Sequence, residues 1–117
     1  MRKTKLYPWS ALEQRVPVKA VVSGIDLMII RYGDEVSVLY GRCLHRGVLL
    51  ANGAIIGKKV VCNWHGWAFR YDTGEAGQRC PALKKFTAWV DADYLWVDAD
   101  EIESWGEANP QPYQTSD

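Results

Sequence analysis

The sequence predicts a small all-β domain, an open antiparallel barrel or sandwich. From Val16 onward, short runs rich in valine, isoleucine, leucine and tyrosine are typical of strands. Turn signals that contain glycine or aspartate separate these runs at frequent intervals. The chain has 117 residues, the length of one domain, and 48% of them are hydrophobic, so a core can form without disulfide bonds.

The predicted elements follow one another with few interruptions. Ser10 and Glu13 have the spacing of a capping box, which predicts a single helical turn over residues 9–14. The strand-like runs cover residues 16–24, 26–33, 35–41, 53–56, 59–62, 67–72, 85–90 and 94–98. Residues 99–108 then predict a short helix, with acidic residues near its positive end.

We expect residues 1–108 to form the folded domain. The polar, proline-containing residues 109–117 are expected to be an exit linker or a frayed tail. Trp9 and Trp105 fall on the two helical segments, where their rings could anchor these segments to the barrel.

Composition excludes several classes of partner. The formal net charge is zero and the pI is about 6.7, so no basic surplus favours nucleic acid or acidic lipid. The apolar runs are too short to span a membrane, and no apolar segment follows the basic start as it would in a signal peptide. Three cysteines without an export signal indicate a reducing compartment, so we expect a cytoplasmic protein.

Both histidines of the chain lie next to cysteines, in two short clusters. Cys43 and His45 are two residues apart, so in an extended segment both can face one metal centre. Cys62 and His65 are three residues apart and can do the same from a tight turn, with Gly66 relieving crowding. The predicted hairpin of residues 53–62 would bring the two clusters side by side.

Three interpretations of these clusters compete. Four ordinary buried residues would not explain why both histidines are paired with cysteines. Two cysteines and two histidines would suit tetrahedral zinc, which predicts a zinc-stabilised binding module. Zinc sites, however, usually group cysteines in one knuckle and histidines in the other, whereas each cluster here mixes the two. In the third interpretation the centre is a [2Fe–2S] cluster in which two histidines replace two cysteines on one iron.

The order "CLH", sixteen residues and "CNWH" resembles the Rieske family of [2Fe–2S] domains over most of residues 16–98. This resemblance implies a Rieske fold, with a cluster-binding lobe built from two loops. It implies that Cys43 and Cys62 bind the inner iron, and that His45 and His65 bind the outer iron near the surface. Two thiolates leave the oxidised core neutral, so reduction is easier than in four-cysteine clusters.

The loops resemble one branch of this family more than another. Rieske proteins of cytochrome bc complexes carry two further cysteines, at positions that are Val48 and Trp64 here. The segments "CLHRG" and "CNWHGWAFRYDTGE" look more like the Rieske domains of ring-hydroxylating oxygenases and Rieske-type ferredoxins. The positions that match this pattern are Arg46, Gly47, Gly66, Trp67, Phe69 and Gly74.

The resemblance implies an electron carrier without a catalytic centre of its own. An oxygenase also needs a mononuclear iron held by two histidines and a carboxylate, and both histidines here are already assigned. The implied donor is a flavin reductase, and the implied acceptor is an oxygenase or another oxidoreductase. Cys80, the third cysteine, is expected to be a non-ligand thiol. The tail also weakly resembles the exit from Rieske modules in longer flavin-dependent, glutamate-synthase-like chains.

Overall fold

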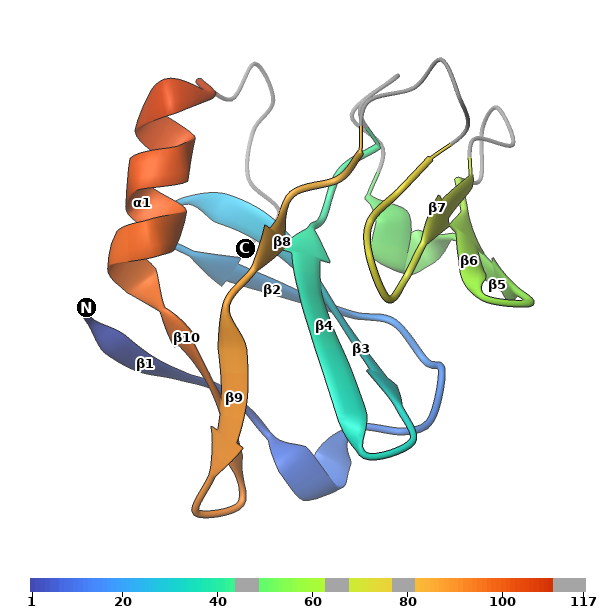
Figure 1. Ribbon diagram of the computed structural model, residues 1–117, viewed down its shortest axis with the longest axis horizontal. Helices are drawn as coiled ribbons and strands as arrows, with labels where there is room; N and C mark the ends of the chain where they lie inside the picture. Colours follow the sequence, from blue (N-terminus) through green and yellow to red (C-terminus); the bar gives the residue numbers. More distant parts are fainter. Residues whose placement is uncertain (44–48, 63–67, 77–81, 111–117) are drawn as a thin grey trace.

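The computed structural model describes residues 1–43, 49–62, 68–76 and 82–110. Three antiparallel sheets in these ranges confirm the all-β prediction (Figure 1). Their strand orders are β1–β10–β9, β2–β3–β4–β8 and β5–β6–β7. The strands are β1 (Lys3–Pro8), β2 (Val18–Val22), β3 (Ile25–Tyr32), β4 (Glu35–Tyr40), β5 (Ala54–Ile56), β6 (Lys59–Val61), β7 (Ala68–Arg70), β8 (Lys85–Phe86), β9 (Ala88–Asp91) and β10 (Tyr94–Asp98). The helices are the 3-10 turns η1 (Trp9–Ala11) and η2 (Leu50–Asn52), and α1 (Ala99–Ala108).

Strand β3 forms the centre of the larger sheet. Every residue from Ile25 to Ile30 is buried, which means that both faces of the strand are covered. The turn before it places Ser23 at φ 51° and Gly24 at φ 75°. Two consecutive positive φ values match the twist of a two-residue hairpin, and only glycine adopts them without strain. The predicted turn between the runs 16–24 and 26–33 is therefore confirmed, and the structure shows that it closes the antiparallel hairpin of β2 and β3.

Strand β1 was not predicted from the sequence. Its residues, KTKLYP, are basic and show no clean apolar alternation, yet they pair with β10 in antiparallel register. The ammonium group of Lys5 lies 4.6 Å from the ring centroid of Tyr94 and 5.6 Å from that of Trp96. This cation–π contact favours a lysine on the outer face of the sheet. The predicted helical turn over 9–14 is shorter in the structure, as η1.

The predicted strand over residues 85–90 is divided at Thr87. β8 pairs with β4 and β9 pairs with β10, so the chain crosses from one sheet to another between them. The backbone N–H and the hydroxyl group of Thr87 donate to the carboxylate of Glu101 at 2.8 and 3.0 Å. Glu101 therefore satisfies the backbone group that the break in the ladder leaves without a strand partner.

The helix predicted over residues 99–108 is confirmed as α1. Asp98 caps it, because its side chain accepts a hydrogen bond from the backbone N–H of Asp100 at 3.0 Å. The ring of Trp105 lies 4.9 Å from that of Tyr40 and 5.6 Å from that of Phe86, centroid to centroid, so it anchors α1 as expected. Among the described residues, no helix has the length and apolarity needed to cross a membrane.

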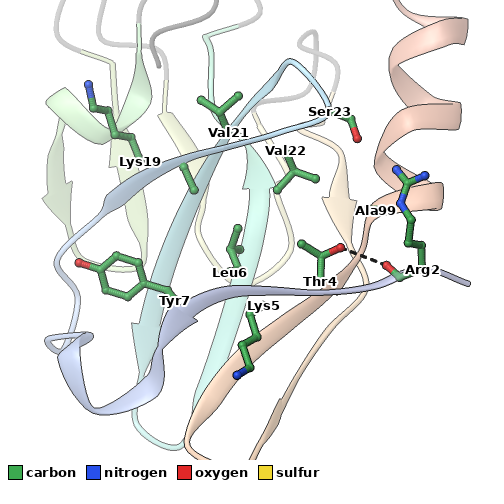
Figure 2. A pocket seen from close by; sticks show the side chains of 11 residues that line it. Arg2, Thr4, Lys5, Leu6, Tyr7, Lys19, Val21, Val22, Ser23 and Ala99 are labelled. Atoms are coloured by element: carbon green, nitrogen blue, oxygen red, sulfur yellow. Dashed lines mark hydrogen bonds between the residues drawn. The ribbon is translucent and has the colours of Figure 1, made fainter.

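The β5–β6–β7 sheet forms a small lobe on the opposite side of β2–β4 from α1 (Figure 1). An open groove of about 600 Å³ lies elsewhere, between the edge strands β1 and β2. Figure 2 shows Leu6 and Val22 between the two strands, and the Thr4 hydroxyl group donating to the Arg2 carbonyl oxygen at 3.3 Å. No cysteine lines this groove, so it is separate from the predicted metal centre.

Candidate metal centre

Cys43 follows β4 at a point where two backbones nearly touch. The N–H of Gly41 donates to the carbonyl oxygen of Asp26, and the carbonyl oxygen of Gly41 accepts from the N–H of Leu50, both at 2.8 Å. A Cβ atom on Gly41 would lie 2.8 to 2.9 Å from the backbone of Leu27, so only glycine fits without a shift. Cys43 itself is buried, with 1% of its surface exposed. The strand end thus places its thiol inside the protein.

An antiparallel bridge closes the first loop. Arg42 pairs with Leu49, so residues 43–48 form the loop and Cys43 is its first residue. Leu50, which begins η2, is fully buried and ties the returning chain to Gly41. The base of this loop is therefore held by backbone hydrogen bonds and by the core.

The second loop has the same construction. Val61, the last residue of β6, pairs with Ala68, the first residue of β7, so residues 62–67 form the loop. Cys62 is its first residue and is 3% exposed. Each predicted thiolate ligand therefore begins a six-residue loop that is closed by an antiparallel pair.

One glycine joins the bases of the two loops. Gly53 donates its N–H to the carbonyl oxygen of Leu50 at 2.9 Å, at the end of η2. A Cβ atom on Gly53 would overlap the carbonyl oxygen of Val61. Leu50 belongs to the base of the first loop and Val61 to the base of the second. Direct packing of Gly53 on Val61, beside the Ala54–Val61 pair of the β5–β6 hairpin, therefore brings the bases of the two loops together.

Two of the four predicted ligands lie outside the described residues. His45 and His65 fall in the ranges 44–48 and 63–67, as do Arg46, Gly47, Gly66 and Trp67. Cys80 also lies outside the described residues. Within the described ranges, no three histidine, cysteine or acidic side chains gather as a metal site, which is expected when only two of the predicted ligands are included.

The remaining two positions of the family pattern have structural explanations. Phe69 is fully buried in β7, opposite Val60. Gly74 has φ +82°, and a Cβ atom there would overlap the carbonyl oxygen of Leu83. The N–H of Leu83 also donates to the carbonyl oxygen of Gly74 at 2.8 Å. These contacts fold the chain that follows β7 back toward β8.

A charged pair beside the first loop was not predicted from the sequence. Asp26 of β3 is 3% exposed, and its Oδ2 atom accepts from Nε of Arg42 at 2.7 Å. Asp26 interrupts the apolar run "GIDLMII", and a carboxylate in a buried strand requires a cationic or hydrogen-bonding partner. This interruption of the apolar run is the sequence feature that could have indicated a buried ion pair. The partner of Asp26 could not be inferred, because Arg42 is sixteen residues away, beyond the end of β4.

A second ion pair lies on β7, after the second loop. Arg70 donates to Asp72 through Nε at 3.0 Å and through Nη2 at 2.8 Å. These hydrogen bonds from the guanidinium hold the pKa of Asp72 below its ordinary value. The pair is partly exposed, so it contributes modestly to stability.

The donor set fits an iron–sulfur cluster. Cys43 and Cys62 are both buried and outside disulfide bonds. Thiolates are the soft ligands that iron–sulfur clusters require, and burial excludes water from the sulfur atoms. Two such residues at equivalent loop positions can hold one iron between them.

A comparison with protein families identifies the fold family. The family model described as "Rieske [2Fe-2S] domain" matches residues 3–95. The chain belongs to the Rieske [2Fe–2S] domain family. The cofactor of this Rieske domain is therefore a Rieske-type [2Fe–2S] cluster, and its chemistry is one-electron transfer. The same match favours the iron–sulfur interpretation over the zinc module.

Curated relatives match the Rieske domain as one part of a longer chain. Methylxanthine N1-demethylase NdmA of Pseudomonas putida is 35% identical over 66 residues, covering 56% of this chain and 18% of the relative. The terminal oxygenase component CarAa of carbazole 1,9a-dioxygenase from Sphingomonas sp is 34% identical over 67 residues, with 56% and 18% covered. The chain thus spans about a fifth of the length of these relatives.

Solved structures share the fold across most of the chain. The Sphingomonas yanoikuyae B1 ferredoxin has a TM-score of 0.75 and 23% identity, covering 83% of this chain and 98% of its own. The ferredoxin of carbazole 1,9a-dioxygenase from Nocardioides aromaticivorans IC177 has a TM-score of 0.76 and 23% identity, with 83% and 97% covered. These similarities confirm the Rieske fold.

Proposed function

We propose that this chain is a Rieske-type ferredoxin, a one-electron carrier between two redox proteins. Cys43 and Cys62 bind the inner iron, and His45 and His65 bind the outer iron. The observation that supports this proposal is the matched pair of loops: each begins with a buried cysteine and is closed by an antiparallel pair. When bound, the cluster accepts and releases one electron at a potential of roughly −150 to +300 mV.

The protein residues orient the ligands and exclude water. The loop bases are joined through Gly41, Leu50 and Gly53, and these contacts would orient the two thiols toward a shared cluster. Preorganised ligands reduce the ordering that cluster binding must supply. The buried side chains of Val60 and Phe69 lie next to the base of the second loop and exclude water from it.

The first experiment is an absorption and electron-paramagnetic-resonance spectrum of the purified protein, before and after dithionite. We expect a brown protein with equal iron and acid-labile sulfide. Its reduced form should show a rhombic signal whose mean g value is below that of four-cysteine clusters. A colourless protein with one equivalent of zinc would instead establish the zinc-stabilised binding module and end the electron-transfer proposal.

We propose a flavin reductase as the donor and an oxygenase as the acceptor. Support comes from ferredoxins of similar fold, one of which is described in a complex of reduced oxygenase and oxidised ferredoxin in carbazole 1,9a-dioxygenase. A cytoplasmic location follows from the same assignment, because a flavin reductase would draw electrons from the cytoplasmic nicotinamide pool. Anaerobic mixing with NADH and a flavin reductase should bleach the oxidised spectrum. Bleaching by dithionite but by no flavin reductase would contradict this donor.

A second candidate is a Rieske module within a longer oxidoreductase chain. The curated relatives favour it, because they match this chain over only 18% of their length. The match to the terminal oxygenase of carbazole 1,9a-dioxygenase from Novosphingobium sp. KA1 likewise covers 82% of this chain and only 29% of the oxygenase chain. Intact mass of the native polypeptide separates the two candidates. A mass near 13.3 kDa supports the ferredoxin, and a much larger mass supports the module.

A further inference from the structure

A buried charge pair lies next to the first ligand loop. Asp26 is the only charged residue among the buried residues that the structure describes, and 3% of its side chain is exposed. Its partner Arg42 is 12% exposed, and their Nε–Oδ2 distance is 2.7 Å. Removing a carboxylate from water costs several kcal/mol, on the order of the attraction that a well-placed guanidinium returns. Such a pair contributes little net stability, so its position calls for another explanation.

Asp26 holds two successive residues of the chain that leads into the loop. Its carbonyl oxygen accepts from the N–H of Gly41 at 2.8 Å, which extends the β3–β4 ladder by one pair. Its side chain binds Arg42, the next residue. Cys43, the proposed iron ligand, follows directly. Backbone and side chain of one aspartate therefore fix the two residues before the first thiolate.

We propose that Asp26 is a positioning residue for the cluster: through Arg42 it fixes the entry of the first ligand loop and neutralises the guanidinium charge beside the redox centre. This inference rests on the proposed function, because it takes Cys43 as an iron ligand. Arg42 pairs with Leu49 across the loop base, so the guanidinium carries a full charge at the closing pair itself. The carboxylate of Asp26 thus lies against this partly buried positive charge at 2.7 Å.

The charge balance predicts opposite effects for the two partners. Reduction adds one negative charge to the cluster, so a positive charge nearby stabilises the reduced form. Asp26→Asn removes the carboxylate and leaves the guanidinium, so the midpoint potential should rise. Arg42→Gln removes the guanidinium and leaves the carboxylate, so the potential should fall. Both shifts are expected to be measurable because solvent screens partly buried charges weakly.

The double variant and a conservative variant separate charge from structure. Asp26→Asn combined with Arg42→Gln restores neutrality, so its potential should return close to that of the wild type. Arg42→Lys keeps the charge but loses the planar fork of donors, so its potential should lie nearer the wild type than that of Arg42→Gln. A merely structural role would not give shifts of opposite sign that cancel.

The matched control is an exposed ion pair far from the loops. Glu103 of α1 binds Arg2 at 2.8 Å, and the two side chains are 49% and 54% exposed. Figure 1 shows α1 on the opposite side of β2–β4 from the β5–β6–β7 lobe. Glu103→Gln removes the same charge as Asp26→Asn, but screening by solvent should leave the potential unchanged.

The experiment is a redox titration of each iron-loaded variant, followed by the visible spectrum and by electron paramagnetic resonance. Opposite shifts in the single variants, with recovery in the double variant, would support the proposal. An unchanged potential in Asp26→Asn with full iron content would overturn it. If Asp26→Asn does not fold, Arg42→Gln and the double variant decide: a potential equal to the wild type in Arg42→Gln overturns the proposal. A wild-type protein without the Rieske signal would instead mean that the proposed function had failed.

Discussion

Gly53 packs against the carbonyl oxygen of Val61 with no room for a side chain between them. This contact joins η2, which ends the first ligand loop, to β6, which leads into the second. The β5–β6 hairpin, in which Ala54 pairs with Val61, places the bases of the two loops side by side. The Gly53–Val61 contact lets the two bases approach closely at the start of this hairpin, next to Cys62.

Gly53→Ala should therefore weaken both the fold and the cluster. The added methyl group meets backbone atoms, which cannot rotate away, and such overpacking costs about 1–3 kcal/mol. We expect a lower unfolding midpoint in guanidinium chloride and fewer iron atoms per folded chain. Gly33→Ala is the control, because a Cβ atom there meets nothing within 4 Å and only the φ of +66° is strained. Equal iron loss in both variants would contradict a specific role for Gly53.

Substitution of the proposed ligands should distinguish the residues that bind the inner iron from those that bind the outer iron. Cys43→Ser or Cys62→Ser should lose most of the iron, because a hydroxyl group is a poor ligand for the inner iron. His45→Cys should retain some cluster, with a potential that falls toward the value of about −400 mV typical of four-cysteine ferredoxins. Cys80→Ser, the matched control, should keep full iron content. A His45→Cys variant with a wild-type potential would show that His45 does not bind the outer iron.

Leu50→Ala tests whether the core beneath the first loop supports the cluster. Leu50 is fully buried, and truncating such a leucine costs about 2–5 kcal/mol. Ile102→Ala in α1 is the control, because Ile102 is equally buried but belongs to the helix. Both variants should unfold at lower denaturant concentration, whereas only Leu50→Ala should lose iron while still folded. Identical iron contents would mean that the loop base tolerates the cavity.

The N-cap of α1 should make the free energy of unfolding depend on pH in the acid range. Backbone N–H groups of Arg2 and Asp100 donate to Asp98 at 3.1 and 3.0 Å, and they hold the pKa of this carboxyl below its ordinary value. A lowered folded-state pKa stabilises the protein above the unfolded pKa of about 3.9, and the contribution disappears as the pH falls through the folded pKa.

Asp98→Asn keeps an acceptor at the cap but does not titrate. Its unfolding free energy should therefore fall less steeply than that of the wild type below about pH 4. Denaturant unfolding at a series of pH values measures this difference, with Asp34→Asn in the exposed β3–β4 turn as the charge-matched control. Parallel pH profiles for the wild type and Asp98→Asn would show that the cap does not contribute to acid unfolding.

Some elements could be predicted because their signals are local. The turn at Ser23–Gly24 and the helix beginning after Asp98 are set by residues adjacent in sequence, and both predictions are confirmed. Strand β1 could not be predicted, because its Lys5 is stabilised by rings of β10, about ninety residues away. The break at Thr87 depends in the same way on a carboxylate of α1.

The sequence by itself determined the family and its cofactor, and it predicted the four ligands. Two mixed cysteine–histidine clusters at a fixed spacing are a property of residue type and order, and they lead to the Rieske family without coordinates. Only the tertiary structure decided how the residues next to Cys43 and Cys62 are held. Gly53 packs against the backbone of Val61, and Asp26 forms an ion pair with Arg42. Both contacts join segments that are not adjacent in sequence, and their energies depend on burial and distance, which a linear pattern does not contain.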